Sequence, residues 1–162
     1  DGSVKALVEN LKLTSKTKVN IYLNDTLSGS QTQLGEFFSS KWNYDNDNGN
    51  VSTSITDALE QMQDINITPM EYDLSQIYSQ TGIDIYDFLQ EQTVANGFDM
   101  MATNDSDFDS ATFSHLNKIT IPYPYIKEMN LWRAWQQFAE AFQLHIFKNR
   151  HGKIVCIYRG GD

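Results

Sequence analysis

The strongest constraint on the fold lies near the C-terminus, where a helical spacing of apolar residues gives way to an alternating one. Apolar residues recur at positions i, i+1, i+4, i+7, i+8 and i+11 of one segment: Leu131, Trp132, Trp135, Phe138, Ala139 and Phe142. This spacing forms one broad stripe on an α-helix, and Asn130 is a suitable N-cap. Residues 144–147 and 154–158 then predict two strands joined by a turn at 149–152. The segment therefore predicts a helix followed by a β-hairpin.

The N-terminal part of the chain predicts β-structure. Residues 18–24 alternate between apolar and polar side chains, the pattern of a half-buried strand. Aromatic and β-branched residues at 42–44 and 51–55 flank a run of Asp, Asn and Gly at 45–50, which predicts a hairpin. Residues 57–60 have the Asp and Glu spacing of a capping box and predict a short helix.

The middle of the chain predicts helices and a loop. One helix through residues 74–78 is expected to end at Gly82, because glycine favours the position after a helix end. Another is expected to begin at an Asp84 N-cap and to end at Gly97. Residues 99–114 are rich in Asp, Ser, Thr and Asn and predict an exposed loop.

These patterns predict an α+β protein with three subdomains. Residues 1–66 are expected to form short β-hairpins and a partial barrel-like sheet, and residues 67–118 an acidic helical subdomain. Residues 119–162 are expected to form a helix-plus-hairpin subdomain, whose first stretch contains two prolines that exclude a central strand. Strands and helices do not alternate as βαβ units, which excludes a parallel α/β fold.

Charged residues are sorted along the chain. The net charge of −9 resolves into +1 for residues 1–41, −14 for residues 42–117, which hold no Lys or Arg, and +4 for residues 118–162. Binding to nucleic acids and to anionic membranes depends largely on Lys and Arg. We therefore expect neither partner for this chain. No apolar run of about 18 residues is present, so no membrane span is expected.

The sequence contains no residue set that predicts catalysis, a cofactor site or a metal site, and we expect no enzyme. The Asp and Asn residues at 45–50 miss the ligand register of an EF-hand loop, and the alternate carboxylates at 105–109 fit a solvated loop. Cys156, the single cysteine, is expected to be a packed strand residue. The histidines match no metal-ligand spacing: His115, His145 and His151.

Two segments resemble bacteriophage tail hub or tail-tip proteins and together cover somewhat over half of the chain. The first consists of stretches in the N-terminal half: Val19-Asn-Ile-Tyr-Leu-Asn-Asp-Thr26, Phe37-Phe38, Trp42-Asn-Tyr-Asp45 and residues 51–65. The second consists of stretches near the C-terminus: Ile121-Pro-Tyr-Pro-Tyr125, Leu131-Trp-Arg-Ala-Trp135, Phe138-Ala-Glu-Ala-Phe142 and His151-Gly-Lys-Ile-Val155. The order of helix, strand, turn at 149–153 and strand resembles these hub proteins.

The resemblance implies a non-enzymatic structural protein of a phage or prophage tail, located in the virion tail after assembly in the bacterial cytoplasm. It implies a homo-oligomer, a trimer in the full-length context, that contacts other tail proteins. The chain begins Asp-Gly-Ser without Met, and we interpret it as a fragment of a longer polypeptide. The sorted charges are expected either to pair the acidic and basic segments of neighbouring copies or only to solvate the acidic helical subdomain.

Two other functional classes stay open. A carbohydrate- or peptide-binding module would use the aromatic side chains of Trp42, Tyr44 or the Pro-Tyr-Pro-Tyr stretch at 122–125. A hydrolase would use two carboxylates of the acidic middle, and it requires a cleft that contains a carboxyl group of raised pKa.

Overall fold

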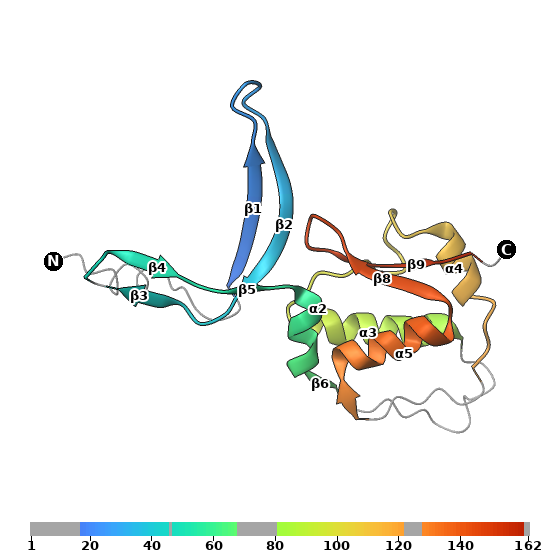
Figure 1. Ribbon diagram of the computed structural model, residues 1–162. Coiled ribbons are helices and arrows are strands. Elements are labelled where there is room, and N and C mark those ends of the chain that lie inside the picture. Colours follow the sequence, from blue (N-terminus) through green and yellow to red (C-terminus); the bar gives the residue numbers. More distant parts are fainter. Residues whose placement is uncertain (1–16, 46, 68–80, 122–127, 161–162) are drawn as a thin grey trace. The chain divides into compact units, whose positions relative to one another are not determined.

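The computed structural model of the protein describes residues 17–45, 47–67, 81–121 and 128–160. It contains helices and small antiparallel sheets, which confirms the predicted α+β class (Figure 1). The strands of the described residues form separate sheets of two or three strands and no closed barrel. The helix expected at 74–78 lies outside the described residues, as does most of the proline-containing stretch.

The chain divides into two compact units. Unit 1 comprises Asp1–Ala58 and Arg150–Gly152, and unit 2 comprises Leu59–Asn149 and Lys153–Asp162. The three subdomains expected from the sequence stay a prediction.

Unit 1 is built from antiparallel hairpins (Figure 1). β1 (Lys18–Asn24) pairs along its length with β2 (Gln31–Ser39), and the C-terminal end of β2 also pairs with β5 (Ile55–Thr56). β3 (Asn43–Asp45) and β4 (Asn50–Ser52) form the second hairpin, as the sequence predicts. Its turn follows from local chemistry, because the carboxylate at the end of β3 accepts hydrogen bonds from two backbone N–H groups of the turn.

One strand of unit 1 is shorter than predicted. The sequence predicts a single strand over 51–55, but β4 ends before Thr53 and the last residue of that range belongs to β5. The Thr53 hydroxyl donates to the Lys41 carbonyl at 3.3 Å, and the Ser40 N–H donates to the Ser54 carbonyl at 2.8 Å. These hydrogen bonds fix the chain as it passes from the β3–β4 hairpin to the edge of β2.

A buried serine organises the base of the β1–β2 hairpin. Ser39 is fully buried, and its hydroxyl accepts hydrogen bonds from the Trp42 indole N–H at 3.0 Å and from the Thr17 backbone N–H at 3.2 Å. Lys18 and Glu36 form an ion pair across the two strands at 3.3 Å. The base of this hairpin is therefore held by packing and polar contacts.

The remaining elements lie in unit 2 or at its border. In chain order they are α2 (Ala58–Gln61), the 3-10 helix η1 (Met62–Asp64), β6 (Asn66–Ile67), α3 (Gly82–Ala95), α4 (Ser110–Leu116), β7 (Met129–Asn130), α5 (Leu131–Ala141), β8 (Leu144–Lys148) and β9 (Ile154–Tyr158). β6 pairs with β7 and β8 pairs with β9, both antiparallel. α5 packs against α3, β8 and η1, so it lies at the centre of the unit 2 core.

The C-terminal helix and hairpin form as the sequence predicts. The Asn130 side chain accepts a hydrogen bond from the Arg133 N–H at 2.7 Å and caps α5. Trp135 is fully buried, and its ring packs edge-on against Tyr86 of α3 with centroids 5.5 Å apart. Its indole N–H donates to the Thr93 hydroxyl at 2.9 Å. Most of the predicted apolar stripe therefore faces the core: Leu131, Trp135, Phe138 and Ala139 are buried.

The start of α3 corrects two predictions. Thr81 is the N-cap, and Asp84 is the third helical residue, where its carboxylate accepts a hydrogen bond from the Thr81 N–H at 2.7 Å. Gly82 is the first residue of α3, whereas the sequence predicts it as the glycine that follows a helix. A Cβ at this position would lie only 3.1 Å from the Leu116 carbonyl oxygen, so the close approach of Leu116 favours glycine. The predicted end is confirmed, since Gly97 follows α3 with a φ of 87°.

The segment 99–114 is not an exposed loop, which corrects a further prediction. Met100 and Phe108 are buried, and the end of the segment forms most of α4. The Asp109 carboxylate caps this helix by accepting hydrogen bonds from the Thr112 N–H at 2.8 Å and the Thr112 hydroxyl at 2.7 Å. The polar composition of residues 99–114 led to a wrong prediction, because several polar side chains of this segment form caps and turns. The few apolar side chains of the segment enter the core.

Candidate interaction surfaces

The distal half of the β1–β2 hairpin carries exposed apolar side chains. We call residues 22–34 the hairpin arm. Its large apolar residues have high exposed fractions: Tyr22 48%, Leu23 59%, Leu27 97% and Leu34 55%. Single exposed leucines are ordinary on protein surfaces, but several within one short segment indicate an interaction surface.

Both faces of the hairpin arm are exposed. Leu23 lies opposite Thr32 and Tyr22 lies opposite Gln33, so neighbouring apolar residues of β1 point to opposite faces. The sequence predicts that Leu23 is on a buried face, and the structure corrects this. Among the described residues, no second layer covers this part of β1. The apolar–polar alternation of the sequence therefore extends beyond the part of β1 that is half-buried.

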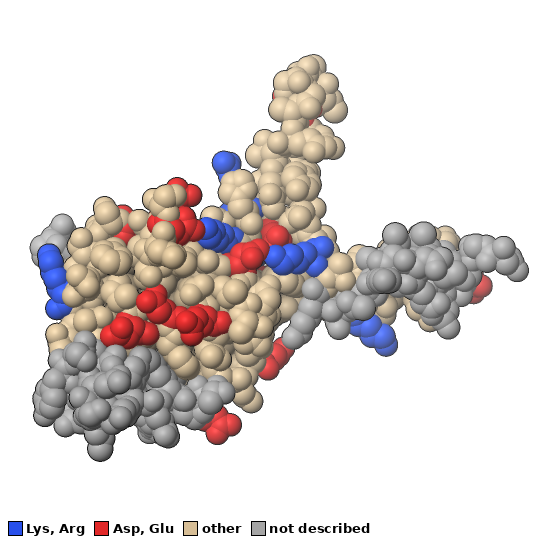
Figure 2. Space-filling model, turned by 180° about the vertical axis from the view of Figure 1, so that it is seen from behind, with Lys and Arg blue, Asp and Glu red and all other residues tan. Residues whose placement is uncertain are grey.

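The hairpin arm is nearly uncharged. Asp25 is the one charged residue of 22–34, and Figure 2 shows an arm surface with almost no acidic or basic side chains. The Asp25 carboxylate accepts hydrogen bonds from the Ser28 hydroxyl at 2.5 Å and from the Leu27 N–H at 2.9 Å. These bonds hold the pKa of Asp25 below its usual value and stabilise the tip turn. A partner of the arm therefore meets an apolar and neutral polar surface.

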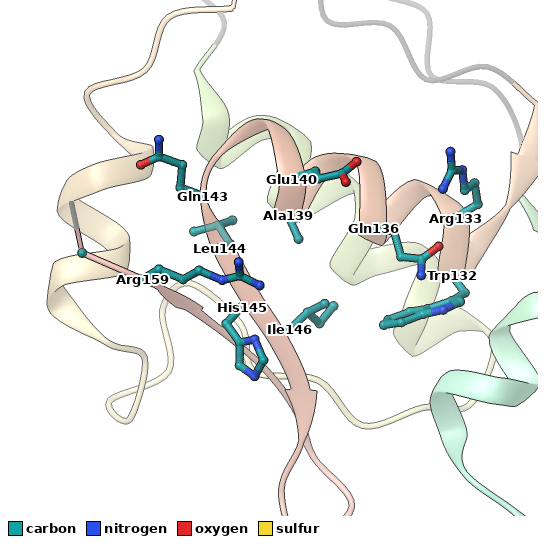
Figure 3. A pocket seen from close by; sticks show the side chains of 11 residues that line it. Trp132, Arg133, Gln136, Ala139, Glu140, Gln143, Leu144, His145, Ile146 and Arg159 are labelled. Atoms are coloured by element: carbon teal, nitrogen blue, oxygen red, sulfur yellow. The ribbon is translucent and has the colours of Figure 1, made fainter. Parts of the chain in front are cut away.

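A groove lies between α5 and β8, within unit 2 (Figure 3). Its volume is about 600 Å³. The α5 wall includes residues on one face of the helix: Trp132, Gln136 and Ala139. Gln143, which follows the C-cap of α5, also lines the groove. The β8 wall consists of consecutive residues: Leu144, His145 and Ile146. Because side chains alternate along a strand, a wall of consecutive residues means that the groove runs along the edge of β8.

Charged side chains border this groove. Arg133 and Glu140 project from α5, and Arg159 follows β9 (Figure 3). Neither guanidinium group has a hydrogen bond or an ion pair within the described parts of the chain. Two arginines against one glutamate leave the groove positive in a chain whose net charge is −9. The groove therefore suits a ligand that carries negative charge.

The three histidines lie in different surroundings. His115 stacks on Tyr158 with ring centroids 3.7 Å apart, and its Nε2 lies 2.9 Å from the Phe142 carbonyl oxygen. His145 is exposed on β8 and borders the groove. His151 is exposed in the turn that precedes β9. The structure brings no two of them into one site.

The single cysteine is a packed strand residue, as predicted. Cys156 is 1% exposed, and burial raises the pKa of its thiol to about 12. A thiol of this kind is a poor nucleophile at neutral pH. In the part of the chain that the structure describes, no three His, Cys, Asp or Glu side chains are grouped so that they could hold a metal ion.

Two acidic residues of the segment 105–109 have structural partners. Asp105 forms an ion pair with Lys153, which lowers the pKa of the carboxyl group, and Asp109 caps α4. Asp87 shows the opposite shift, because burial raises the pKa of its carboxyl group although it accepts a hydrogen bond from Thr103 at 2.9 Å. Asp87 does not line the α5–β8 groove.

The aromatic residues considered for ligand binding have different exposures. Tyr44 is 44% exposed on β3, whereas Trp42 is half-buried with its indole bonded to Ser39. The Pro-Tyr-Pro-Tyr stretch lies outside the described residues. Trp132, expected in the core, is half-buried and borders the groove. In the sequence, Trp132 lies at the edge of the apolar stripe, four residues before the polar Gln136. This position at the border between apolar and polar faces is the sequence signal for its partial exposure.

No helix in the described part of the chain has the length and the apolar character needed to cross a membrane. No protein-family model, curated protein or solved structure matches the chain.

Proposed function

We propose that the chain is a non-enzymatic structural module of a phage or prophage tail, and that its hairpin arm is buried when it assembles. The partners are other copies of the chain and other tail proteins. The observation that supports assembly is the exposure of four large apolar side chains on the two faces of one hairpin. The tail context rests on the resemblance of the two sequence segments.

Burial of the hairpin arm provides free energy for association. Complete burial of a leucine side chain contributes about 1.5–3 kcal/mol relative to leaving it in water. Leu27 is 97% exposed, and the other apolar residues of the arm are about half exposed. The arm therefore contributes on the order of 5 kcal/mol per copy before the cost of association. In a closed ring each copy supplies the same contribution.

The edge of the sheet supports the same proposal. β1 is an edge strand of the sheet formed by β1, β2 and β5 in the described residues. Proteins protect exposed edge strands with Lys, Pro or a covering element, because unpaired backbone groups associate with other chains. The hairpin arm contains neither Lys nor Pro. An arm of this kind is suited to pairing with a partner.

Sedimentation velocity of the whole chain over a range of concentrations tests the proposal. A variant with Leu23→Ser, Leu27→Ser and Leu34→Ser should dissociate at concentrations where the unchanged chain is oligomeric. Val94→Ser is the matched control, because Val94 is an exposed apolar residue of α3, 48% exposed and outside the arm. If the unchanged chain is monomeric at every concentration, or if both variants behave alike, assembly through the arm is wrong.

Salt separates this proposal from the charge pairing expected from the sequence. Association through the arm should change little with ionic strength, because Asp25 is the one charge on it. Pairing of the acidic and basic segments should weaken as ionic strength rises. Oligomers that dissociate in high salt and ignore the leucine variants would contradict the arm as the contact.

The tail context is tested by mass spectrometry of purified particles. Tails prepared from a strain that carries the gene should contain peptides of this chain in a fixed ratio to the tube protein. Purified tails without those peptides would contradict the proposed location and leave the assembly measurement unaffected.

A further inference from the structure

The hydrogen-bond phase of the β8–β9 ladder shows which backbone groups face the groove. The Arg159 N–H donates to the Gln143 carbonyl at 3.1 Å, and this pair continues the register of the two strands. Bonded and non-bonded positions alternate along an antiparallel pair. Leu144 and Ile146 therefore occupy non-bonded positions, where the N–H and C=O groups point away from β9. Both residues line the groove.

On the outer edge of β9, by contrast, backbone groups that point away from β8 have hydrogen-bond partners. The Ile154 N–H donates to the Asp99 carbonyl at 2.8 Å, and the Ile154 carbonyl accepts from the Met101 N–H at 3.1 Å. The Tyr158 N–H donates to the Thr112 hydroxyl at 2.6 Å. The two outward residues of β8 named above have no such partner in the residues that the structure describes. The groove therefore borders a strand edge with unused backbone donors and acceptors.

The other wall of the groove is a helix face that suits side chains of a bound strand. Trp132 and Gln136 of α5 line the same space as Ile146 of β8 (Figure 3). The half-buried indole offers an apolar surface, and the amide offers a donor and an acceptor. A strand edge beside a helix is the arrangement in which domains bind an extended peptide as an added strand.

The charges of the groove select among such peptides. Arg133 and Arg159 present guanidinium groups with no partner in the described residues, and Glu140 is the one acidic residue of the lining. Guanidinium groups form charge-assisted, often paired hydrogen bonds with carboxylates. A basic peptide would have one favourable contact, with Glu140, and would be repelled by the two guanidinium groups. An acidic peptide would have two favourable contacts, one with each guanidinium group.

We propose that the α5–β8 groove binds an extended acidic segment of a partner protein as an additional strand along β8. Backbone groups of the segment hydrogen-bond to Leu144 and Ile146, its carboxylates contact Arg133 and Arg159, and an apolar side chain packs on Trp132. This groove is separate from the hairpin arm, so it would give the assembled chain a second kind of partner.

A fluorescein-labelled hexapeptide of alternating Asp and Val, capped at both ends, tests the proposal by fluorescence polarisation with the whole chain. The acidic peptide should bind, and the same peptide with Lys in place of Asp should bind at least tenfold more weakly. N-methylation of alternate peptide amides should also reduce affinity at least tenfold, because it removes the strand hydrogen bonds and keeps the side chains. Equal binding of the methylated peptide would overturn the added-strand geometry.

Variants of the chain locate the site. Arg133→Gln and Arg159→Gln should each weaken binding of the acidic peptide about tenfold, the usual effect of losing one charge-assisted hydrogen bond. Arg150→Gln, an exposed arginine outside the groove, is the matched control and should leave affinity unchanged. Hydrogen exchange should slow at the amides of Leu144 and Ile146 when the peptide binds. No peptide binding, unchanged affinity in both variants, or binding of an acidic oligosaccharide but not of the peptide would each overturn the proposal.

Discussion

Replacement of the central tryptophan of α5 tests the core of unit 2 most sharply. Trp135 has no exposed surface, and its indole packs edge-on against Tyr86 at 5.5 Å and against Phe138 at 5.9 Å. Its N–H donates to the Thr93 hydroxyl, which in turn donates to the Leu89 carbonyl at 2.7 Å. Trp135→Ala removes the ring contacts and one hydrogen bond, and it leaves a cavity between α3 and α5.

The magnitude follows from these contacts. Truncation of a buried tryptophan to alanine costs about 3–5 kcal/mol. The edge-on aromatic contacts are worth about 0.5–1.5 kcal/mol each beyond buried area, which places Trp135→Ala near the upper end. Trp135→Phe keeps most of the apolar area and should cost about 1–2 kcal/mol, mainly the hydrogen bond and some packing. Domains of this size have unfolding free energies of about 5–15 kcal/mol, so the alanine variant is close to unfolding.

Urea denaturation followed by far-ultraviolet circular dichroism measures these costs without relying on tryptophan fluorescence. Trp132→Ala is the matched control, because Trp132 is half-buried at the groove on the same helix. It should lose less than half the free energy of unfolding that Trp135→Ala loses. Equal losses for the two tryptophans, or a loss below about 1 kcal/mol for Trp135→Ala, would refute the placement of the core.

Two further predictions concern helix ends in unit 2. Asp109→Ala should cost about 1 kcal/mol at neutral pH, because it removes the N-cap of α4. Hydrogen bonds from the Thr112 side chain and backbone hold the pKa of Asp109 below its usual value of 3.8. The cap is therefore fully effective above about pH 4 and is lost as pH falls through the folded-state pKa, so thermal melts of the two proteins should converge in acid. Gly97→Ala should lower the free energy of unfolding by about 1–2 kcal/mol in urea denaturation, because a residue with a Cβ is strained at the φ of 87° that Gly97 adopts. A Cβ there would meet no atom within 4 Å, so backbone strain is the whole expected cost. An unchanged midpoint would contradict the conformation of that turn.

Local patterns predict the elements whose residues carry their own signal. The stripe of α5, its Asn130 cap and the β8–β9 hairpin follow from spacing and turn chemistry within one segment. Residues 99–114 carry no such signal, because Phe108 enters the core through a contact with Tyr86 at 5.3 Å that is distant in sequence. Gly82 resembles a helix terminator in sequence, and its role in α3 depends on the nearness of Leu116.

The two interaction surfaces differ in how far the sequence predicts them. Alternation predicts β1, but it also predicts a buried Leu23, and exposure depends on whether another layer covers the strand. The groove requires that α5 lie beside the edge of β8, which no local pattern of either element specifies. The unpaired state of Arg133 and Arg159 likewise depends on tertiary structure.

Hydrogen exchange across an assembly titration tests the central claim most directly. Backbone amides of the hairpin arm, residues 22–34, should exchange more slowly in the oligomer than in the dilute monomer. The amides of Arg150 and His151, which are exposed in the turn before β9, should not change. Unchanged exchange across the arm in an oligomer that has formed would contradict the proposal that the arm is the contact between copies.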